Sequence, residues 1–380
     1  MLPWTYALRN LWRRRARTVL TILGIAAISL LVILMTGFAR GLSASAAKTA
    51  SPEVLVLTGN ANEHDLVRSV IGRRAAETVA AKIPGVVTVE GVRAASPEIH
   101  IATRKGDVIG LMRGVTPAAF VVHDRVTLVE GREPQGFREL IVGRLAAVRM
   151  GLPAEALAIG ATIELENVPW TVVGAFAAPG TVLEAELWGR LDDVVEATQR
   201  TDLSCVATRF ATEDDADLAR VWVYRNGVAY EVAAIKETEL YGTLEQALLP
   251  LARLAELMAL LILVGGVFAC ANTMFAAVLS RGREIGALRA LGYGPAAIGV
   301  SLLQESLLLA LVGGTVGFWA ASLFGDVPLK FPMGAFTLDL SPTVRVVGLM
   351  AAALIGIVGG LVPAWRAWRL PIPQALGGKV

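Results

Sequence analysis

The chain has few of the residues that build catalytic centres and disulfide-bonded scaffolds. Its 380 residues include two cysteines and three histidines, and only 18% of the residues are charged. Cys205 falls in a polar region and Cys270 in a long apolar run, so we do not expect them to meet, and the fold should not depend on a disulfide. Neither cysteine has metal-ligand spacing, which favours a packing role for both.

Catalytic motifs are also missing from the sequence. It contains no G-x-x-x-x-G-K-[ST] phosphate loop, no H-E-x-x-H and no G-x-S-x-G, so we do not expect it to hydrolyse ATP itself. His64, His100 and His123 are scattered through one polar region, and a metal site would require the fold to bring them together. We therefore predict no catalytic residue, bound cofactor or metal ligand in this chain.

Long apolar runs, in contrast, are plentiful, and the mean hydropathy is +0.58. Each of the four longest runs can cross the roughly 30 Å hydrocarbon core of a bilayer. The first run also permits a secretory signal peptide with a cleavage site near 44–46, but its apolar length of about twenty residues exceeds the usual 7–15, so we expect a retained helix. The predicted spans are 19–39, 254–280, 296–324 and 343–363.

Basic residues predict the orientation of these spans. Segment 1–18 carries five arginines and no acidic residue, loop 281–295 carries three arginines, and tail 364–380 carries three basic residues. The positive-inside rule then places both termini and the 281–295 loop in the cytoplasm, with the protein in the cell (inner) membrane and in contact with membrane lipid. Segment 1–18 is predicted to be an amphipathic lead-in helix. The alternative, which stays open, is that its charges only determine the topology.

Residues 40–253 are predicted to form a large extracytoplasmic domain. They contain 22 Lys/Arg and 28 Asp/Glu, a difference of −6. A strand–helix–strand pattern covers 52–92, and short strands fill 95–210, so we predict an α/β lobe with an inserted β-rich lobe. The fold class is thus membrane α-helical, with four transmembrane helices and a large α+β domain between the first and second; 325–342 is predicted to be a short outer loop. An uninterrupted helical pattern over 237–279 leaves no flexible linker to absorb motion.

Polar and small residues inside the spans are candidates for structural or functional roles. Asn272 is predicted to hydrogen-bond between helices. The carboxylate of Glu305, preceded by Gln304, is energetically costly to place at membrane depth. Three roles stay open for it: a conformational latch, a substrate contact, or a group within reach of the headgroups. Small residues that permit close helix packing are Gly313, Gly314 and Gly317.

The most informative stretch is RGREIGALRALG at 281–292. Ile285, Leu288 and Leu291 recur at a spacing that gives a short helix one apolar stripe, and the remaining face is charged. A simple turn between two spans needs neither feature. The stretch therefore predicts a cytoplasmic helix that docks against a partner.

Four segments together resemble a known family. They are ALRNLWRRRARTVLTILGI at 7–25, ELIVGRLAAVRMGL with IGATIEL and WTVVGAF over 139–176, RGREIGALRALG at 281–292, and VPAWRAWRLPIPQAL at 362–376. Over nearly its whole length, the chain resembles the permease subunits of the MacB/FtsX/LolC-type ABC transporters.

The resemblance implies a dimeric permease, formed with a second permease copy or homologue, and two copies of a separate ABC ATPase subunit that binds ATP and Mg. It implies mechanotransmission, in which the outer domain moves to drive export or extraction of a lipophilic or envelope substrate. The alternative is an FtsX-like signalling subunit that regulates an envelope partner such as a wall hydrolase. A periplasmic adaptor is a further partner consistent with the family, and no nucleic acid is expected. The ATPase-coupling residues that it implies are Arg281, Arg283, Glu284, Ile285, Leu288, Arg289 and Leu291.

Overall fold

The computed structural model describes residues 12, 15–60, 65–105, 108–324, 327–331 and 334–369. The chain forms two compact units. The first, called the helical unit, comprises Met1–Arg40, Leu251–Val327 and Leu338–Val380, and the second, called the sheet unit, comprises Gly41–Pro250 and Pro328–Thr337. Most of the predicted lead-in helix at 1–18, and the tail from 370 onward, lie outside the described residues.

Within the described residues, four helices are long and apolar enough to cross a membrane, which confirms the predicted number of spans. The short helix α9, Gly282–Ala290, separates the second from the third. Two of the four continue beyond the predicted spans into the sheet unit, so no loop of flexible composition intervenes. The four helices are α2 (Arg15–Thr49), α8 (Glu237–Ser280), α10 (Pro295–Ala321) and α11 (Pro342–Arg369).

Glycines on α10 let neighbouring helices approach it closely. A Cβ atom at Gly314 would lie 2.6 Å from the Cβ of Ala352 on α11. At Gly313 and Gly317, an added Cβ would lie within 2.9 Å of backbone oxygens of α2. Larger side chains at these positions would push the helices apart, so α2, α10 and α11 pack through contacts that only small residues allow.

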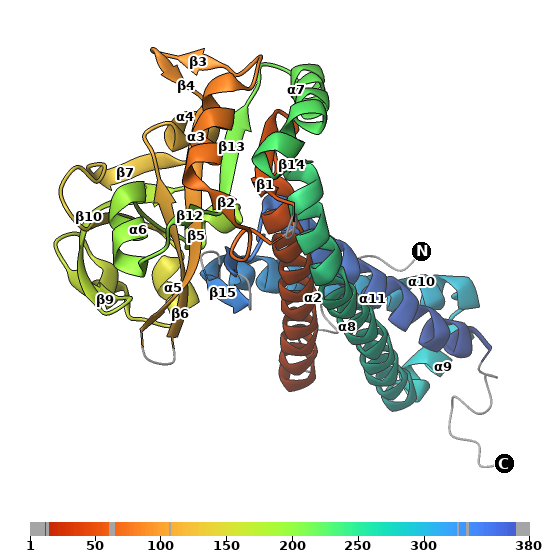
Figure 1. Ribbon diagram of the computed structural model, residues 1–380. Helices are drawn as coiled ribbons and strands as arrows, with labels where there is room; N and C mark the ends of the chain where they lie inside the picture. Colours follow the sequence, from red (N-terminus) through yellow and green to blue (C-terminus); the bar gives the residue numbers. More distant parts are fainter. Residues whose placement is uncertain are drawn as a thin grey trace. The chain divides into compact units, whose positions relative to one another are not determined.

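The sheet unit is built on one mixed sheet of ten strands (Figure 1). The order is β14-β1-β13-β5-β6-β11-β8-β10-β7, and β9 pairs with β10. The antiparallel β5–β6 ladder joins the part formed by β1, β13 and β14 to the part formed by the remaining strands. The strands are β1 (Val54–Gly59), β5 (Ala95–Lys105), β6 (Val108–Val115), β7 (Thr127–Gly131), β8 (Glu139–Gly143), β9 (Thr162–Leu165), β10 (Val168–Ala177), β11 (Leu187–Arg190), β13 (Cys205–Arg209) and β14 (Val232–Lys236).

Strand β1 is covered on both faces, as its continuous apolar sequence requires. Leu55 and Leu57 point to the face covered by α3 (Arg73–Lys82) and α7 (Glu213–Asn226). Val54 and Val56 point to the opposite face, where they pack with α4 (Ala119–Val122) and the first turn of α8. The start of α8 is therefore part of the sheet unit's own core.

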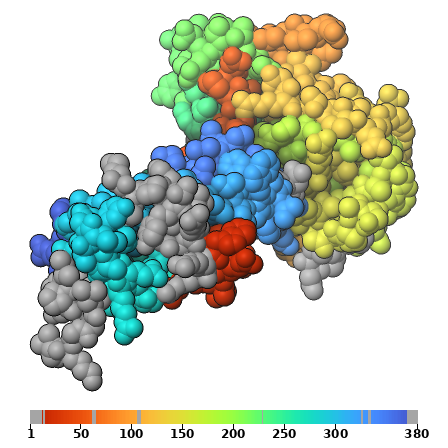
Figure 2. All heavy atoms as spheres, turned by 180° about the vertical axis from the view of Figure 1, so that it is seen from behind, coloured from red at the N-terminus to blue at the C-terminus, as the bar shows by residue number. Residues whose placement is uncertain are grey.

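Two predicted elements of this unit differ in the structure. Residues 86–92 were expected to form one strand of the strand–helix–strand pattern, but Thr88–Val89 (β3) pairs with Val92–Arg93 (β4) in a separate two-stranded ladder, and Val86 forms an isolated bridge with Phe210. The predicted outer loop at 325–342 contains the hairpin β15 (Pro328–Phe331) and β16 (Gly334–Thr337), which belongs to the sheet unit. Ala335 of this hairpin is fully buried against Leu145 and Ala185, and Figure 2 shows the hairpin beside the yellow-green part of the unit. Sequence patterns miss both features because tertiary packing, and not propensity, decides strands of two to four residues.

The remaining short elements connect these layers. They are β2 (Ile71–Gly72), which pairs with β12 (Asp202–Leu203), the helices α5 (Ala146–Met150) and α6 (Leu191–Thr198), and the 3₁₀ turns Ala154–Leu157, Val182–Ala185, Gly227–Tyr230 and Ser322–Phe324.

Candidate functional site

A cluster of buried charged side chains lies on one face of the sheet unit. It begins on β5, where Ile99 and Ile101 point into the apolar core and the alternating residues Glu98 and His100 point to the other face. His100 pairs directly with Arg113 on the neighbouring strand β6. Strand alternation and register therefore place an acid, a histidine and an arginine together within an otherwise apolar fold.

Arg113 is the centre of this cluster. Its Nε and Nη2 atoms donate to the two oxygens of Glu186, at 2.8 and 2.9 Å, and its Nη1 donates to Glu98 at 2.9 Å. The Trp188 ring lies 5.4 Å from the guanidinium carbon, and its Nε1 donates to Glu186. Burial alone would raise the pKa of Glu98, but His123 and Arg113 hold it well below its usual value. Both carboxylates thus stay ionised beside Arg113.

The same cluster connects the two chain segments that lead to the membrane helices. His123 contacts Glu98 through Nε2 at 3.1 Å and lies 3.9 Å from Glu237 through Nδ1. Glu237 is the first residue of α8, and its Oε2 accepts a hydrogen bond of 2.9 Å from the backbone N–H of Ser51, just after α2. The segment just after α2 and the first residue of α8 are therefore joined to each other and to the sheet.

Three of these side chains also have the arrangement of a possible metal site. Donor atoms of Glu98, His100 and Cys205 lie within 4.8 Å of one another. However, Arg113 already donates to the Glu98 carboxylate, and burial raises the pKa of the Cys205 thiol well above its usual value, which disfavours the thiolate that a metal needs. The fold does bring His100 and His123 together, but as partners of one carboxylate. His64 lies outside the described residues.

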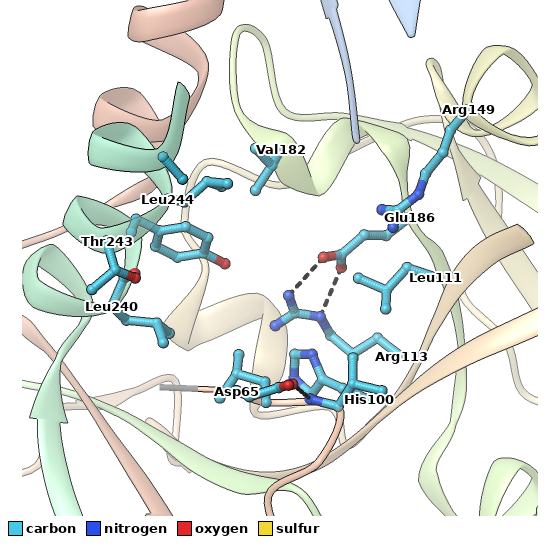
Figure 3. A pocket seen from close by; sticks show the side chains of 14 residues that line it. Asp65, His100, Leu111, Arg113, Arg149, Val182, Glu186, Leu240, Thr243 and Leu244 are labelled. Carbon is cyan, nitrogen blue, oxygen red and sulfur yellow. Dashed lines mark hydrogen bonds and ion pairs between the residues drawn. The ribbon is translucent and has the colours of Figure 1, made fainter. Parts of the chain in front are cut away.

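A cavity of about 320 Å³ opens beside the cluster, entirely within the sheet unit. In Figure 3, Leu240, Thr243 and Leu244 of α8 form one wall, and Arg113, Glu186 and Arg149 face them. The remaining lining side chains are Asp65, Leu66, Val67, His100, Leu111, Val182, Tyr241 and Ala247. An apolar cavity with a few converging polar groups is the usual form of a small-molecule site.

In the helical unit, the main polar contact is a buried ion pair. Arg281, the N-cap residue of α9, donates from Nη1 and Nη2 to the two oxygens of Glu305, at 2.6 and 2.9 Å. Both side chains are under 8% exposed. This bidentate pair attaches the start of α9 to the third span and gives the predicted intramembrane carboxylate a partner inside the chain.

The apolar stripe of α9 is oriented differently from the prediction. Ile285 is 4% exposed and packs against Val278, Ile298 and Leu302 of the chain's own helices, with Leu288 half-buried beside it. The expectation that these two side chains face a partner is therefore corrected: they hold α9 against the spans. The reason is that the helical unit needs an apolar surface to seat a helix this short.

The other coupling-helix residues have varied positions. Arg283, Glu284 and Leu291 are exposed, Leu291 to 77%, and Arg289 is half-buried. The exposed face of α9 thus combines an apolar side chain with charges of both signs. Among the described residues of α9 and its C-cap, this is the face that is open to solvent.

The predicted polar residues of the spans have contrasting environments. Asn272, which was predicted to hydrogen-bond between helices, is exposed on α8. The Oε1 atom of Gln304 is buried and has no hydrogen-bond partner within the described residues. A hydrogen-bond donor from a neighbouring protein would satisfy the Oε1 atom of Gln304.

Comparison with known families agrees with this architecture. The sequence model of the MacB-like periplasmic core domain matches residues 18–250, and that of the FtsX-like permease C-terminal domain matches 256–372. The chain belongs to the MacB/FtsX-type ABC permease family. It is a multi-pass membrane protein with an N-terminal span, a core domain and three further spans.

Individual relatives are similar over different shares of the chain. The pyoverdine export ATP-binding/permease protein PvdT of Pseudomonas entomophila (strain L48) is 26% identical, covering 97% of this chain and 58% of the relative. The macrolide export ATP-binding/permease protein MacB of Nitrobacter winogradskyi (strain Nb-255) is 38% identical over 32% of this chain and 19% of the relative. The chain thus spans about a fifth of the length of one of these two relatives and little more than half of the other.

Among solved structures, the periplasmic region of MacB from Actinobacillus actinomycetemcomitans is similar with a TM-score of 0.38 and 10% identity. That similarity covers 52% of this chain and 94% of the other.

The buried cluster was not found from the sequence. One signal was available: in PEIHIAT, Glu98 and His100 alternate with isoleucines, which marks charged residues on a buried strand face. Their partners Arg113, Glu186 and Glu237 come from distant segments, and no local pattern indicates that they meet.

Proposed function

We propose that this permease couples ATP hydrolysis by a separate ATPase subunit to movement of the sheet unit, and thereby drives export or extraction of a lipophilic or envelope substrate. The observation that carries the proposal is helix α9. One face of it is fixed to the spans by Ile285 and the Arg281–Glu305 pair, and the opposite face is free for a partner.

The exposed face of α9 has the composition of a docking surface. Leu291 provides an apolar anchor, and Arg283 and Glu284 provide charges that set register and exclude wrong partners. Relatives carry the name "ATP-binding/permease", which supports an ATP-binding partner for this chain. Two ATPase copies, each with ATP and Mg, would engage the α9 helices of a permease dimer.

A continuous helix supplies the path for transmission. Helix α8 has 44 residues, ends next to α9, and begins at Glu237 in the buried charge cluster. A displacement of α9 therefore reaches the sheet unit through hydrogen-bonded helix, without a flexible segment. Pro250 interrupts the backbone hydrogen bonding of α8 where the sheet unit ends, which is a natural position for bending.

A second permease copy fits the exposed side of α8. Its apolar window is 17% buried, the lowest share of the four spans. Phe268 is 71% exposed, and the exposed amide of Asn272 lies one turn further along. An amide in a span favours a protein neighbour over lipid, because lipid offers no hydrogen-bond partner.

The arginine distribution gives the orientation within this proposal. Basic residues in segments 1–18, 281–295 and 364–380 support a cytoplasmic position for α9, where ATP is available. The sheet unit then lies outside the inner membrane, together with any periplasmic adaptor or other envelope partner.

The proposal is tested with Leu291→Asp. The permease and its co-encoded ATPase are purified together and ATPase activity is measured in nanodiscs. We expect Leu291→Asp to abolish co-purification, or to lower permease-dependent ATPase activity at least about tenfold, because a charge replaces the apolar anchor.

The matched control is Tyr224→Asp, which changes a side chain 86% exposed on α7 of the sheet unit. It should leave both readouts unchanged. An ATPase that binds and responds equally to Leu291→Asp and to the unaltered permease would refute the proposal.

A further inference from the structure

On one side of the cavity in the sheet unit, the charged side chains Arg113 and Glu186 have hydrogen-bond partners. The charged side chain of Arg149 on the same side has none among the described residues. Arg113 and Glu186 bond to each other twice, and Arg113 also donates to Glu98. The opposite wall, from α8, carries the apolar side chains Leu240 and Leu244 beside the hydroxyl of Thr243 (Figure 3). The paired residues therefore form a fixed rim and leave little hydrogen-bonding capacity for a ligand.

Arg149 is the exception among the lining residues. It lies in the last turn of α5 and is half-buried, and its guanidinium makes no hydrogen bond or ion pair with any residue that the structure describes. Burial lowers the pKa of Arg149, and the negative charge of Glu186 opposes this effect from a distance. A guanidinium has five N–H donors, and losing water from them without acceptors is costly. A folded chain retains such a group when a ligand or water supplies the acceptors.

We propose that this cavity binds an amphiphile whose carboxylate or phosphate group is held by Arg149 and whose apolar chain lies along Leu240 and Leu244. The arginine fork matches both anions in a bidentate geometry. The apolar wall adds binding energy in proportion to the area that the ligand covers. A cation would be repelled by Arg149, and a neutral alcohol would meet fewer of its donors.

The position of the cavity gives such a ligand a mechanical consequence. Leu240 and Leu244 belong to α8, whereas Leu111 and Arg113 belong to β6. A ligand bound between them stabilises the arrangement in which α8 lies against the sheet. The size of this stabilisation is the difference between the ligand's binding free energies in the two arrangements. This binding is independent of the proposed ATPase coupling, so either can fail without the other.

The test uses the full chain in lipid nanodiscs and a decanoate that carries a photoreactive diazirine. After illumination, labelled peptides are located by mass spectrometry. We expect labelling within 240–247 and beside Leu111, with competition by decanoate or decyl phosphate and none by decanol or decyltrimethylammonium. The two anions show which headgroup is preferred. Equal competition by decanol, or full competition by inorganic phosphate alone, would overturn the amphiphile assignment.

Variants separate the anion contact from general effects. Arg149→Gln should weaken decanoate competition by about tenfold or more, as expected for one lost charge-assisted contact. Arg144→Gln, an exposed arginine just before α5, is the matched control and should leave it unchanged. Leu244→Glu, on the opposite wall, should abolish labelling through repulsion of the anion. Unaltered labelling in both Arg149→Gln and Leu244→Glu, with melting temperatures equal to that of the unaltered chain, would refute the site.

Discussion

Arg281 and Glu305 form a buried bidentate ion pair, with Nη–Oε distances of 2.6 and 2.9 Å, that joins the start of α9 to α10. Twenty-four positions separate the two residues. The predicted coupling helix and the predicted intramembrane acid, which the sequence presents as two features, are thus one structural unit. In the proposed mechanism, a force on α9 would reach the third span through this contact.

A double-mutant cycle tests this pairing. Removing one partner leaves the other charge buried and unpaired, so Arg281→Met and Glu305→Met should each lower the free energy of unfolding by about 3–5 kcal/mol. The double variant should lose less than either single variant, because no buried charge remains. Denaturant unfolding in detergent measures all three. Losses that simply add would show that the two residues do not interact.

Ile285 and Leu291 are expected to have opposite effects, although both belong to the apolar stripe of α9. Ile285→Ala leaves a cavity among Val278, Ile298 and Leu302 and should cost about 2–5 kcal/mol of stability. Leu291→Ala removes a side chain that is 77% exposed, so it should change stability by less than about 0.5 kcal/mol and lower ATPase coupling. Thermal unfolding together with ATPase activity distinguishes them, and the reverse pattern would show that α9 is seated the other way.

Residue size at Gly314 is expected to decide packing between α10 and α11. A Cβ atom there would lie 2.6 Å from the Cβ of Ala352, so Gly314→Val should cost about 1–3 kcal/mol through overpacking. Gly265→Val is the matched control, because no atom lies within 4 Å of an added Cβ at Gly265. Equal melting temperatures for the two variants would contradict the helix contact.

The charge cluster predicts a pH dependence of stability that can be traced to His100. Burial and the charge of Arg113 lower the pKa of His100, while the unfolded chain keeps the ordinary value of 6.5. The unfolded state therefore takes up a proton first as the pH falls below 6.5, and the folded state loses relative stability at up to roughly 1.4 kcal/mol per pH unit.

His100→Gln removes this titration and keeps a donor for Glu98. Between pH 7.5 and 5.5 the free energy of unfolding of the unaltered chain should fall relative to that of His100→Gln. This change with pH is expected whatever the difference between their free energies of unfolding at neutral pH. Chemical unfolding at a series of pH values measures the difference. A difference that stays constant over this range would show that His100 titrates normally.

The sequence was sufficient for those parts of the fold that depend on local composition. The four spans follow from apolar length, and the large domain between the first and second follows from its charge. The hairpin at 328–337 was missed because its burial depends on Leu145 and Ala185, far away in the chain. The orientation of α9 was also missed, since an apolar stripe shows that one face is buried but not which neighbour buries it.

The candidate sites were harder to foresee for the same reason. Glu98 and Glu186 are unremarkable in sequence, and only the β5–β6 register and the β11 pairing bring them to one arginine. Arg149 lies in the segment ELIVGRLAAVRMGL that supports the family resemblance, yet nothing local shows that its guanidinium faces a cavity. Spatial convergence of distant residues is a property of the fold.

In the proposed mechanism, ATP acts through α9 to move the sheet unit relative to the helical unit. Both native cysteines are buried, so cysteines introduced at Tyr224 and Leu323, which are 86% and 83% exposed, can be spin-labelled selectively. The most direct measurement is the distance distribution between these labels, recorded by pulsed electron resonance on the permease–ATPase complex in nanodiscs with and without ATP. We expect ATP binding to shift this distance distribution, and we expect Leu291→Asp to abolish the shift. A distribution that is unchanged by ATP, or a shift that persists with Leu291→Asp, would contradict this mechanism.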